Sequence, residues 1–265
     1  MTYPDLLDIG ANLTHDSFDA DRDAVIERAR EHGVRRMIVT GSSEQGSIDA
    51  ANLAEAHPGR LFATAGVHPH HASDYSVAVG QTLRKLAARA DVVAIGECGL
   101  DYFRNFSPRQ AQRDAFQAQL ELAAECNLPV FLHQRDAHDE FVEILQPMRD
   151  RLLGGVAHCF TGKEAELRCY LDMDLYIGIT GWISDERRGS HLKSLVATIP
   201  DDRLMLETDS PYLLPRSLRP RPRTRRNEPM YLREVLRVVA ESTGQPEQLV
   251  AARSTANAQR FFSLT

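Results

Sequence analysis

The stretch Val92-Val93-Ala94-Ile95-Gly96-Glu97 decides the fold class that we predict for this chain. An unbroken run of apolar and small residues, with no alternating polar positions, is typical of a strand that is covered on both faces. The glutamate that follows the run would be costly to bury without a cation or a hydrogen-bond partner. The stretch therefore predicts a core strand of a parallel sheet that ends at a functional carboxylate.

Other short apolar runs occur on both sides of this stretch, and most are followed by longer segments with helical periodicity. This alternation is typical of parallel βα units. Eight units in 265 residues favour a (β/α)8 TIM barrel. An open doubly wound sheet is disfavoured because no GxGxxG motif follows the first strand. We predict an α/β fold in which residues 1–265 form a single TIM-barrel domain with an extra C-terminal helix. The predicted strands are residues 6–9, 36–40, 61–67, 92–96, 130–132, 155–157, 175–179 and 204–206, and the predicted helices are 21–32, 43–56, 108–126, 138–151, 163–172, 228–242 and 246–262.

Residues that favour a helix start support one of these predicted helices in particular. Ser107 precedes Pro108, so a side chain that can cap a helix stands before a proline suited to the first turn. We therefore expect Ser107 to cap the helix over residues 108–126.

The composition indicates an ordinary globular protein and bears on the compartment in which we expect to find it. The chain is 43% hydrophobic and 26% charged, as ordinary globular domains are. No apolar run approaches the roughly 20 residues that a membrane span needs, and the first residues lack the pattern of a secretion signal. The four cysteines form no CxxC pair. We expect a cytoplasmic monomer with reduced thiols, no membrane span and no obligate protein partner.

Polar side chains close six of the predicted strands. In a TIM barrel these ends meet at one mouth, and imidazole and carboxylate groups are natural ligands of a divalent cation there. Any one of the histidines alone would more simply be a hydrogen-bonded residue of the rim, but the joint pattern favours a metal. We predict Glu97, His133, His158 and Asp209 as metal ligands. The remaining polar residues at strand ends are Asn12, His68, His70 and Glu207.

An arginine-rich loop follows the last predicted strand. Six arginines lie between Arg216 and Arg226 in a chain whose net charge is −6, so any affinity for a polyanion has to be local. A solvated proline-rich loop kept extended by its own charge is the alternative interpretation. Because the loop would lie at the barrel mouth, we predict that it contacts substrate phosphates, with Arg225 and Arg226 as binding residues.

Several segments together resemble one family. The sequence resembles the TatD-family metal-dependent deoxyribonucleases, a branch of the amidohydrolase-like barrels. The resemblance covers nearly the whole chain, in order. The matching segments are Asp8-Ile9-Gly10-Ala11-Asn12-Leu13-Thr14, Ala65-Gly66-Val67-His68-Pro69-His70, Ala94-Ile95-Gly96-Glu97-Cys98-Gly99-Leu100-Asp101, Pro129-Val130-Phe131-Leu132-His133, His158-Cys159-Phe160-Thr161-Gly162, Glu207-Thr208-Asp209-Ser210-Pro211-Tyr212-Leu213 and Arg226-Asn227-Glu228-Pro229.

The resemblance implies a metal-dependent phosphodiesterase, and for the most similar branch a 3′-5′ exonuclease of single-stranded DNA or RNA. By this resemblance Glu97, His133 and His158 match metal ligands. Asp209 matches an aspartate that contacts metal and activates water, while His68 and His70 match residues that line the substrate mouth. Many relatives carry an HxH pair where this chain has Gly10-Ala11-Asn12. We therefore expect one firm metal site, and a second ion held only weakly.

The sequence supports a mechanistic hypothesis with two alternatives. We expect Glu97, Asp209 and His68 to be catalytic, with Asp209 as the proton acceptor and His68 or His70 steadying the phosphate. Mg²⁺ is the expected ion, with Mn²⁺ or Zn²⁺ as alternatives, and DNA repair or DNA degradation is the expected role. The first alternative is a metal-dependent ester or amide hydrolase acting on a small-molecule or aminoacyl substrate. The second is a nucleic-acid-binding protein with a vestigial site.

Overall fold

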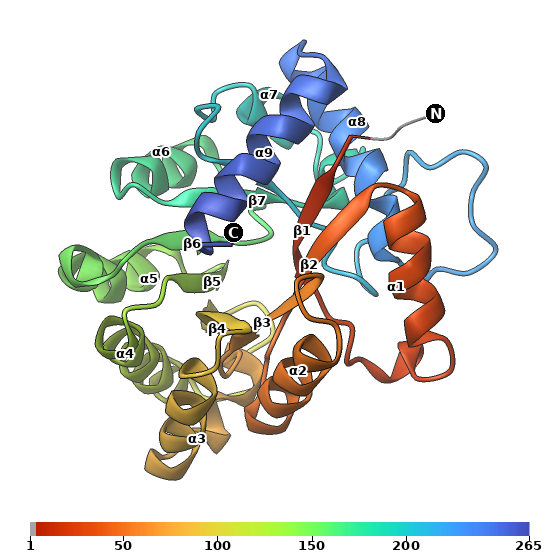
Figure 1. Ribbon diagram of the computed structural model, residues 1–265. Coiled ribbons are helices and arrows are strands. Elements are labelled where there is room, and N and C mark those ends of the chain that lie inside the picture. Colours follow the sequence, from red (N-terminus) through yellow and green to blue (C-terminus); the bar gives the residue numbers. More distant parts are fainter. Residues whose placement is uncertain (1–3, 265) are drawn as a thin grey trace. The chain divides into compact units, whose positions relative to one another are not determined.

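Strands and helices alternate along the chain in the computed structural model, which describes residues 4–264 (Figure 1). Residues 1–3, which belong to the segment considered for a secretion signal, lie outside the described residues. In the sheet the strands follow one another in the order β1 to β8. The chain divides into two compact units. Unit 1 is Met1–Ile38, Cys159–Leu167 and Tyr176–Thr265, and unit 2 is Val39–His158 and Arg168–Leu175.

Unit 1 contains the first and last strands of the chain. Strand β7 pairs in parallel with β8, and β1 joins β8 through a parallel bridge between Ala11 and Ser210. Every residue of β1 is buried, as expected for a strand that is covered on both faces. Helix α9 packs against both β1 and β8. The strands are β1 (Leu6–Ala11), β2 (Val34–Val39, whose last residue belongs to unit 2), β7 (Tyr176–Ile179) and β8 (Leu204–Leu206), and the helices are α1 (Arg22–Glu31), α7 (Leu192–Val196), α8 (Leu232–Thr243) and α9 (Glu247–Phe261). Helix α6 (Glu164–Asp172) begins in unit 1, and its residues from Arg168 onward belong to unit 2.

Unit 2 contains the middle strands, which pair in parallel in the order β3, β4, β5, β6. Helices α3 and α4 pack against β4. The strands are β3 (Leu61–Ala65), β4 (Val92–Asp101), β5 (Val130–Arg135) and β6 (Gly155–Ala157), the helices are α2 (Glu44–Ala56), α3 (Val77–Ala87), α4 (Arg109–Cys126) and α5 (His138–Leu145), and the 3-10 helices include η2 (Pro69–Asp74) and η3 (Gln146–Arg151).

Strand β4 is longer than the sequence predicts, and its geometry depends on glycine. All ten of its residues are buried, and its register against β5 shifts between Gly96 and Cys98. Gly96 has φ 136°, which side chains rarely adopt, and a Cβ on Gly66 would overlap the backbone of Gly96. The two glycines therefore allow the segment after β3 to approach β4 closely, beside Glu97.

Other local predictions also differ from the structure. The helix predicted over residues 138–151 is α-helical only to Leu145 and continues as the 3-10 helix η3, with Pro147 in its first turn. The sequence patterns that we used did not identify α3 or α7. Ser107 does not cap α4, because its hydroxyl donates instead to the carbonyl oxygen of His70 (3.0 Å) and accepts from the backbone N–H of Ser73 (3.1 Å). The helix predicted to begin at residue 228 begins at Leu232, since Pro229–Tyr231 forms a 3-10 turn before it.

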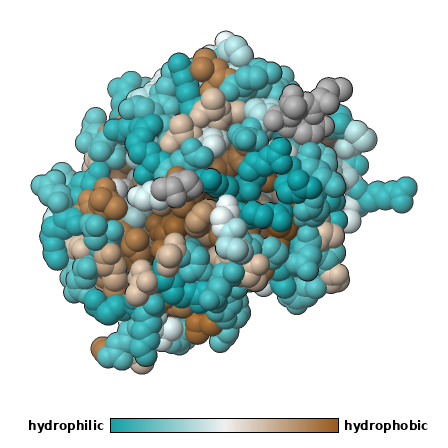
Figure 2. Space-filling view, in the orientation of Figure 1, coloured by the Kyte–Doolittle hydropathy of each residue, from teal (hydrophilic) through white to brown (hydrophobic). Residues whose placement is uncertain are grey.

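Hydrophilic side chains cover most of the face shown in Figure 2, with hydrophobic residues in small groups between them. Among residues 4–264, no helix combines the length and the hydropathy that a membrane span would need.

Candidate metal centre

Glu97, on β4, is the point on which three histidines of unit 2 converge. Its Oε1 lies 2.8 Å from Nε2 of His158 and 2.9 Å from Nδ1 of His133. Nε2 of His68 lies 3.3 Å from the same oxygen. His68 follows β3, His133 lies on β5 and His158 follows β6. The predicted ligands Glu97, His133 and His158 are thus brought together, and His68 joins them.

The position of the His68 proton follows from a local hydrogen bond. His68 precedes η2, and its Nδ1 accepts from the backbone N–H of His70 (3.0 Å). A neutral imidazole that accepts at Nδ1 carries its proton on Nε2. The Nε2–H of His68 therefore points at Glu97 as a donor, a role that differs from the ligand roles predicted for His133 and His158.

Asp101 forms a second carboxylate centre at the end of β4. Its Oδ2 lies 2.9 Å from Nε2 of His70 and 3.5 Å from Nε2 of His133. Its Oδ1 accepts from the backbone N–H of Arg104 (2.8 Å). The ring of His133 is thus flanked by Glu97 on one side and Asp101 on the other. Sequence reasoning assigned no role to Asp101, although strand alternation from Glu97 through Gly99 places it on the same face.

Burial and hydrogen bonds set the charges of this cluster. Burial by itself would raise the pKa of Glu97, but the positive character of His158 and hydrogen bonds from His133 and His158 hold it well below its usual range. Burial likewise opposes ionisation of Asp101, yet hydrogen bonds from His133 and His70 lower its pKa. Desolvation lowers the pKa of His68 to about 4. At neutral pH the cluster thus holds two ionised carboxylates and a neutral His68.

The donor set fits a divalent cation. Ligand atoms of Glu97, His133 and His68 all lie within 4.8 Å of one another, and the predicted ligand His158 joins this group through Oε1 of Glu97. Nε2 of His133 is buried, and its 3.5 Å separation from Oδ2 of Asp101 is too long for a strong hydrogen bond. Buried polar atoms are rarely left unpaired in native proteins. Imidazole nitrogen with carboxylate oxygen is the ligand combination that zinc, manganese and iron favour, and magnesium accepts the carboxylates.

Asp209 and Asn12 lie in unit 1, where they form a cluster of their own. Nδ2 of Asn12 donates to Oδ1 of Asp209 (3.0 Å), and the backbone N–H of Asp209 donates to the carbonyl oxygen of Gly10 (2.8 Å). Glu207, buried at the end of β8, accepts from the backbone N–H of Cys159. The segment after β8 is therefore fixed to the end of β1.

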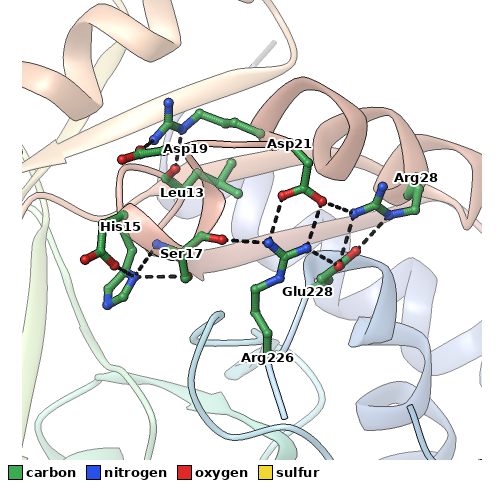
Figure 3. A network of polar contacts seen from close by, with 10 residues as sticks. Leu13, His15, Ser17, Asp19, Asp21, Arg28, Arg226 and Glu228 are labelled. Carbon is green, nitrogen blue, oxygen red and sulfur yellow. Dashed lines mark hydrogen bonds and ion pairs between the residues drawn. The ribbon is translucent and has the colours of Figure 1, made fainter. Parts of the chain in front are cut away.

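The predicted phosphate-binding arginines differ in their surroundings, and Figure 3 shows those of Arg226. The guanidinium of Arg226 donates to the carbonyl oxygen of Ser17, to both carboxylate oxygens of Asp21 and to Glu228. Arg28 binds the same two carboxylates. These bonds raise the pKa of Arg226 and lower that of Asp21. Arg225 is exposed. Arg226 thus fastens the arginine-rich loop to α1, and it could contact a phosphate only by exchanging one of these partners.

The chain is similar to known exonucleases over nearly its whole length. A family model described as TatD related DNase matches residues 7–263. A protein named 3′-5′ ssDNA/RNA exonuclease TatD from Pantoea ananatis is 53% identical over 259 residues, which cover 98% of this chain and 100% of that protein. A protein of the same name from Klebsiella pneumoniae is 51% identical, with 98% of each chain covered.

Solved structures show the same fold. The crystal structure of the TatD homologue YjjV from Escherichia coli superposes with a TM-score of 0.88 at 28% identity, with 98% of each chain covered. A TatD-family hydrolase from Entamoeba histolytica gives a TM-score of 0.87 at 25% identity, with 100% of each chain covered.

The family model and the identities show that this chain belongs to the TatD family of deoxyribonucleases. The predicted fold class is confirmed, an α/β TIM-like barrel of eight strands with C-terminal helices.

Proposed function

We propose that this chain is a divalent-metal-dependent exonuclease that removes nucleotides from the 3′ end of single-stranded DNA or RNA. The observation that carries the proposal is the convergence of His133, His158 and His68 on one oxygen of Glu97, in a chain whose relatives at 51–53% identity are named for this activity. Hydrolysis of a phosphodiester requires an activated water and stabilised charge on phosphoryl oxygen, which a site of this composition supplies.

Glu97, His133 and His158 would hold the ion, with Mg²⁺ as the expected occupant and Mn²⁺ or Zn²⁺ as alternatives. When bound, such an ion stabilises charge on a phosphoryl oxygen and lowers the pKa of a coordinated water. The Glu97 carboxylate is already ionised, so no proton has to leave it when a cation arrives. Any second ion would be held only weakly, with a substrate phosphate among its ligands.

The chain's own residues accept the proton of the attacking water and steady the phosphate. Asp209 accepts the proton that the attacking water loses. The Nε2–H of neutral His68 hydrogen-bonds a phosphoryl oxygen or the leaving oxygen in place of Glu97, because the hydrogen bond at its Nδ1 keeps the proton on Nε2. The leaving oxygen takes its proton from solvent. His70 is held by Asp101 at the same site and steadies the phosphate. Arg225 and its exposed neighbours Arg221 and Arg223 contact phosphates further along the strand.

We further propose that residues 1–265 work as one domain and as a cytoplasmic monomer. The family model, which spans residues 7–263 as a single match, supports the first part. The four free cysteines are consistent with a reducing compartment. DNA repair or DNA degradation is the role that we expect for such an enzyme.

End-labelled oligonucleotides test the activity and its direction. Metal-stripped protein receives Mg²⁺, Mn²⁺ or Zn²⁺ in separate reactions. We expect a 3′-labelled strand to release labelled mononucleotide at once and a 5′-labelled strand to give a ladder of shortening products. Hydrolysis of a p-nitrophenyl ester without cleavage of either strand would contradict the proposal and favour the ester or amide hydrolase.

Asp209→Asn tests the proton-acceptor role. We expect a loss of cleavage of about 10²-fold or more, the usual range for a general base. Binding of the ion is measured on the same protein by calorimetry. Full activity with normal ion binding would exclude Asp209 as the proton acceptor.

A further inference from the structure

Two aromatic side chains of the loop after β4 lie in the solvent. The exposed fractions of Phe103 and Phe106 are 55% and 67%. An exposed aromatic ring forgoes the stabilisation that burial would give it, and two such rings in one short loop indicate an interaction surface. Neither ring takes part in the mechanism proposed above.

The loop that carries the rings is fastened to the candidate metal centre at both ends. At its start, Oδ1 of Asp101 accepts from the backbone N–H of Arg104, while Oδ2 of Asp101 binds His70. At its end, the hydroxyl of Ser107 donates to the carbonyl oxygen of His70. The ring of Phe106 lies against that of His70, with centroids 4.7 Å apart. The exposed rings therefore begin where the histidine cluster ends.

Positive charge accompanies the rings. The guanidinium of Arg135 lies 3.9 Å from the centroid of the Phe103 ring, and that of Arg104 lies 5.8 and 5.9 Å from the Phe103 and Phe106 centroids. Among residues 4–264, no carboxylate forms an ion pair with Arg104 or Arg135. An aromatic surface with unneutralised guanidinium groups is complementary to a single-stranded nucleic acid, since bases stack on the rings and phosphates attract the cations.

We propose that Phe103 and Phe106, with Arg104 and Arg135, form a platform on which bases next to the scissile bond of a single strand stack. This inference rests on the proposed exonuclease function and names how its substrate is recognised. In a duplex the bases stack on each other and pair, so their faces are not available to the rings. The platform therefore selects single strands, and it does so without reading the base sequence because every base has a π face.

The test compares a normal strand with one that lacks bases at its 3′ end. Binding of a 5′-fluorescein oligothymidylate is measured by anisotropy in EDTA, beside the same strand with abasic residues at its two 3′-terminal positions. We expect wild type to bind the normal strand about 10-fold more tightly, in line with the loss of one to two stacked bases. Phe106→Ala and Phe103→Ala should each lose most of that preference.

Matched variants separate stacking from other effects. Phe106→Tyr keeps a ring and should keep the preference, whereas Phe106→Leu keeps only apolar volume and should lose it. Val77→Ala removes an apolar side chain that is 80% exposed at the start of α3, and it should behave as wild type. Equal binding of the two strands by wild type, or an unchanged preference in Phe106→Ala and Phe103→Ala, would overturn the platform.

Cleavage of the same strands distinguishes failure of the platform from failure of the proposed function. If wild type cleaves with a restored ion and Phe106→Ala shows the same base preference and KM, the platform alone is wrong. If wild type cleaves no strand with any ion but the base preference in binding depends on the rings, the exonuclease is wrong and the platform stands.

Discussion

Two buried carboxylates show that their partners, and not burial alone, decide their charge. Asp8 on β1 and Glu97 on β4 are both buried. Glu97 has imidazole partners, and its pKa is held well below the usual range. Among the residues that the structure describes, the donors to Asp8 are all uncharged, namely the hydroxyl and N–H of Thr208 and the N–H of Gly10. Burial raises the pKa of Asp8 to about 7.

Asp8→Asn should change how stability depends on pH. Folded Asp8 keeps its proton while the unfolded residue, with a pKa of 3.8, has lost it. The wild-type free energy of unfolding therefore falls as pH rises from about 4 to 7, by about 4 kcal/mol from this group. The variant lacks this loss, so its stability relative to wild type should increase over the same range. Urea denaturation at several pH values measures it.

The control for Asp8 is Asp74→Asn, an exposed carboxylate whose loss should leave the pH dependence as in wild type. A stability difference between Asp8→Asn and wild type that is the same at pH 4 and pH 7 would contradict the ionisation behaviour assigned to Asp8.

Site residues could be predicted where residue type and position at a strand end coincide. Glu97, His133 and His158 were predicted in this way, and they converge in the structure. Asp101 was missed because it lies beyond the predicted end of its strand, which the sequence placed at residue 96. The proton position on His68 depends on the backbone turn at His70, and no pattern of residue types reveals it.

At the scale of elements, Arg226 joins the arginine-rich loop to α1, and Arg226→Ala should destabilise the protein. In wild type, Arg28 and Arg226 together balance the carboxylates of Asp21 and Glu228. The change leaves two carboxylates with one guanidinium, so one negative charge has no partner. Hydrogen bonds to charged groups contribute about 2 kcal/mol, and we expect a loss of about this size because the group is only partly exposed. Arg225→Ala, at the exposed neighbour, should change stability by less than about 0.5 kcal/mol. Equal losses in both variants would contradict the anchoring role.

The exposed arginines of the same loop should govern the salt dependence of binding. Replacing Arg221, Arg223 and Arg225 with alanine removes three charges, and each phosphate contact on a single strand contributes about 0.7 to the slope of log K against log salt. We expect the slope to become shallower by about 2. The double variant Lys85→Ala and Lys193→Ala, at exposed positions on helices, serves as the control. An unchanged slope in the triple variant would show that the loop is only a solvated segment.

Strands and helices were predicted best where a run of buried apolar residues dominates the sequence pattern. The continuous apolar run of β4 predicted its first half, but the second half alternates with glycine and polar residues and is held in the sheet by its pairing with β5. Helix α3 was missed although Val79, Leu83 and Leu86 are buried at helical spacing behind the Ser76 cap. Its exposed apolar Val77 interrupts the simple amphipathic pattern.

At the scale of the whole molecule, the fold class could be predicted because the βα unit repeats eight times. In each unit an apolar strand has to be covered by the helix that follows it. The prediction that residues 1–265 form one domain can be tested by calorimetry. One domain should unfold in a single transition with equal calorimetric and van't Hoff enthalpies. Two separate transitions, one retained after the other has melted, would show that the two compact units fold independently.

The central claim is that Glu97 organises a divalent-metal centre on which exonuclease activity depends. The most direct measurement pairs ion binding by calorimetry with release of the 3′ nucleotide, for metal-stripped wild type, Glu97→Gln and the exposed control Glu121→Gln. We predict that wild type and Glu121→Gln bind the ion and regain activity, whereas Glu97→Gln folds but loses ion binding and at least 10²-fold in activity. A folded Glu97→Gln protein that binds the ion and cleaves as wild type does would contradict the claim.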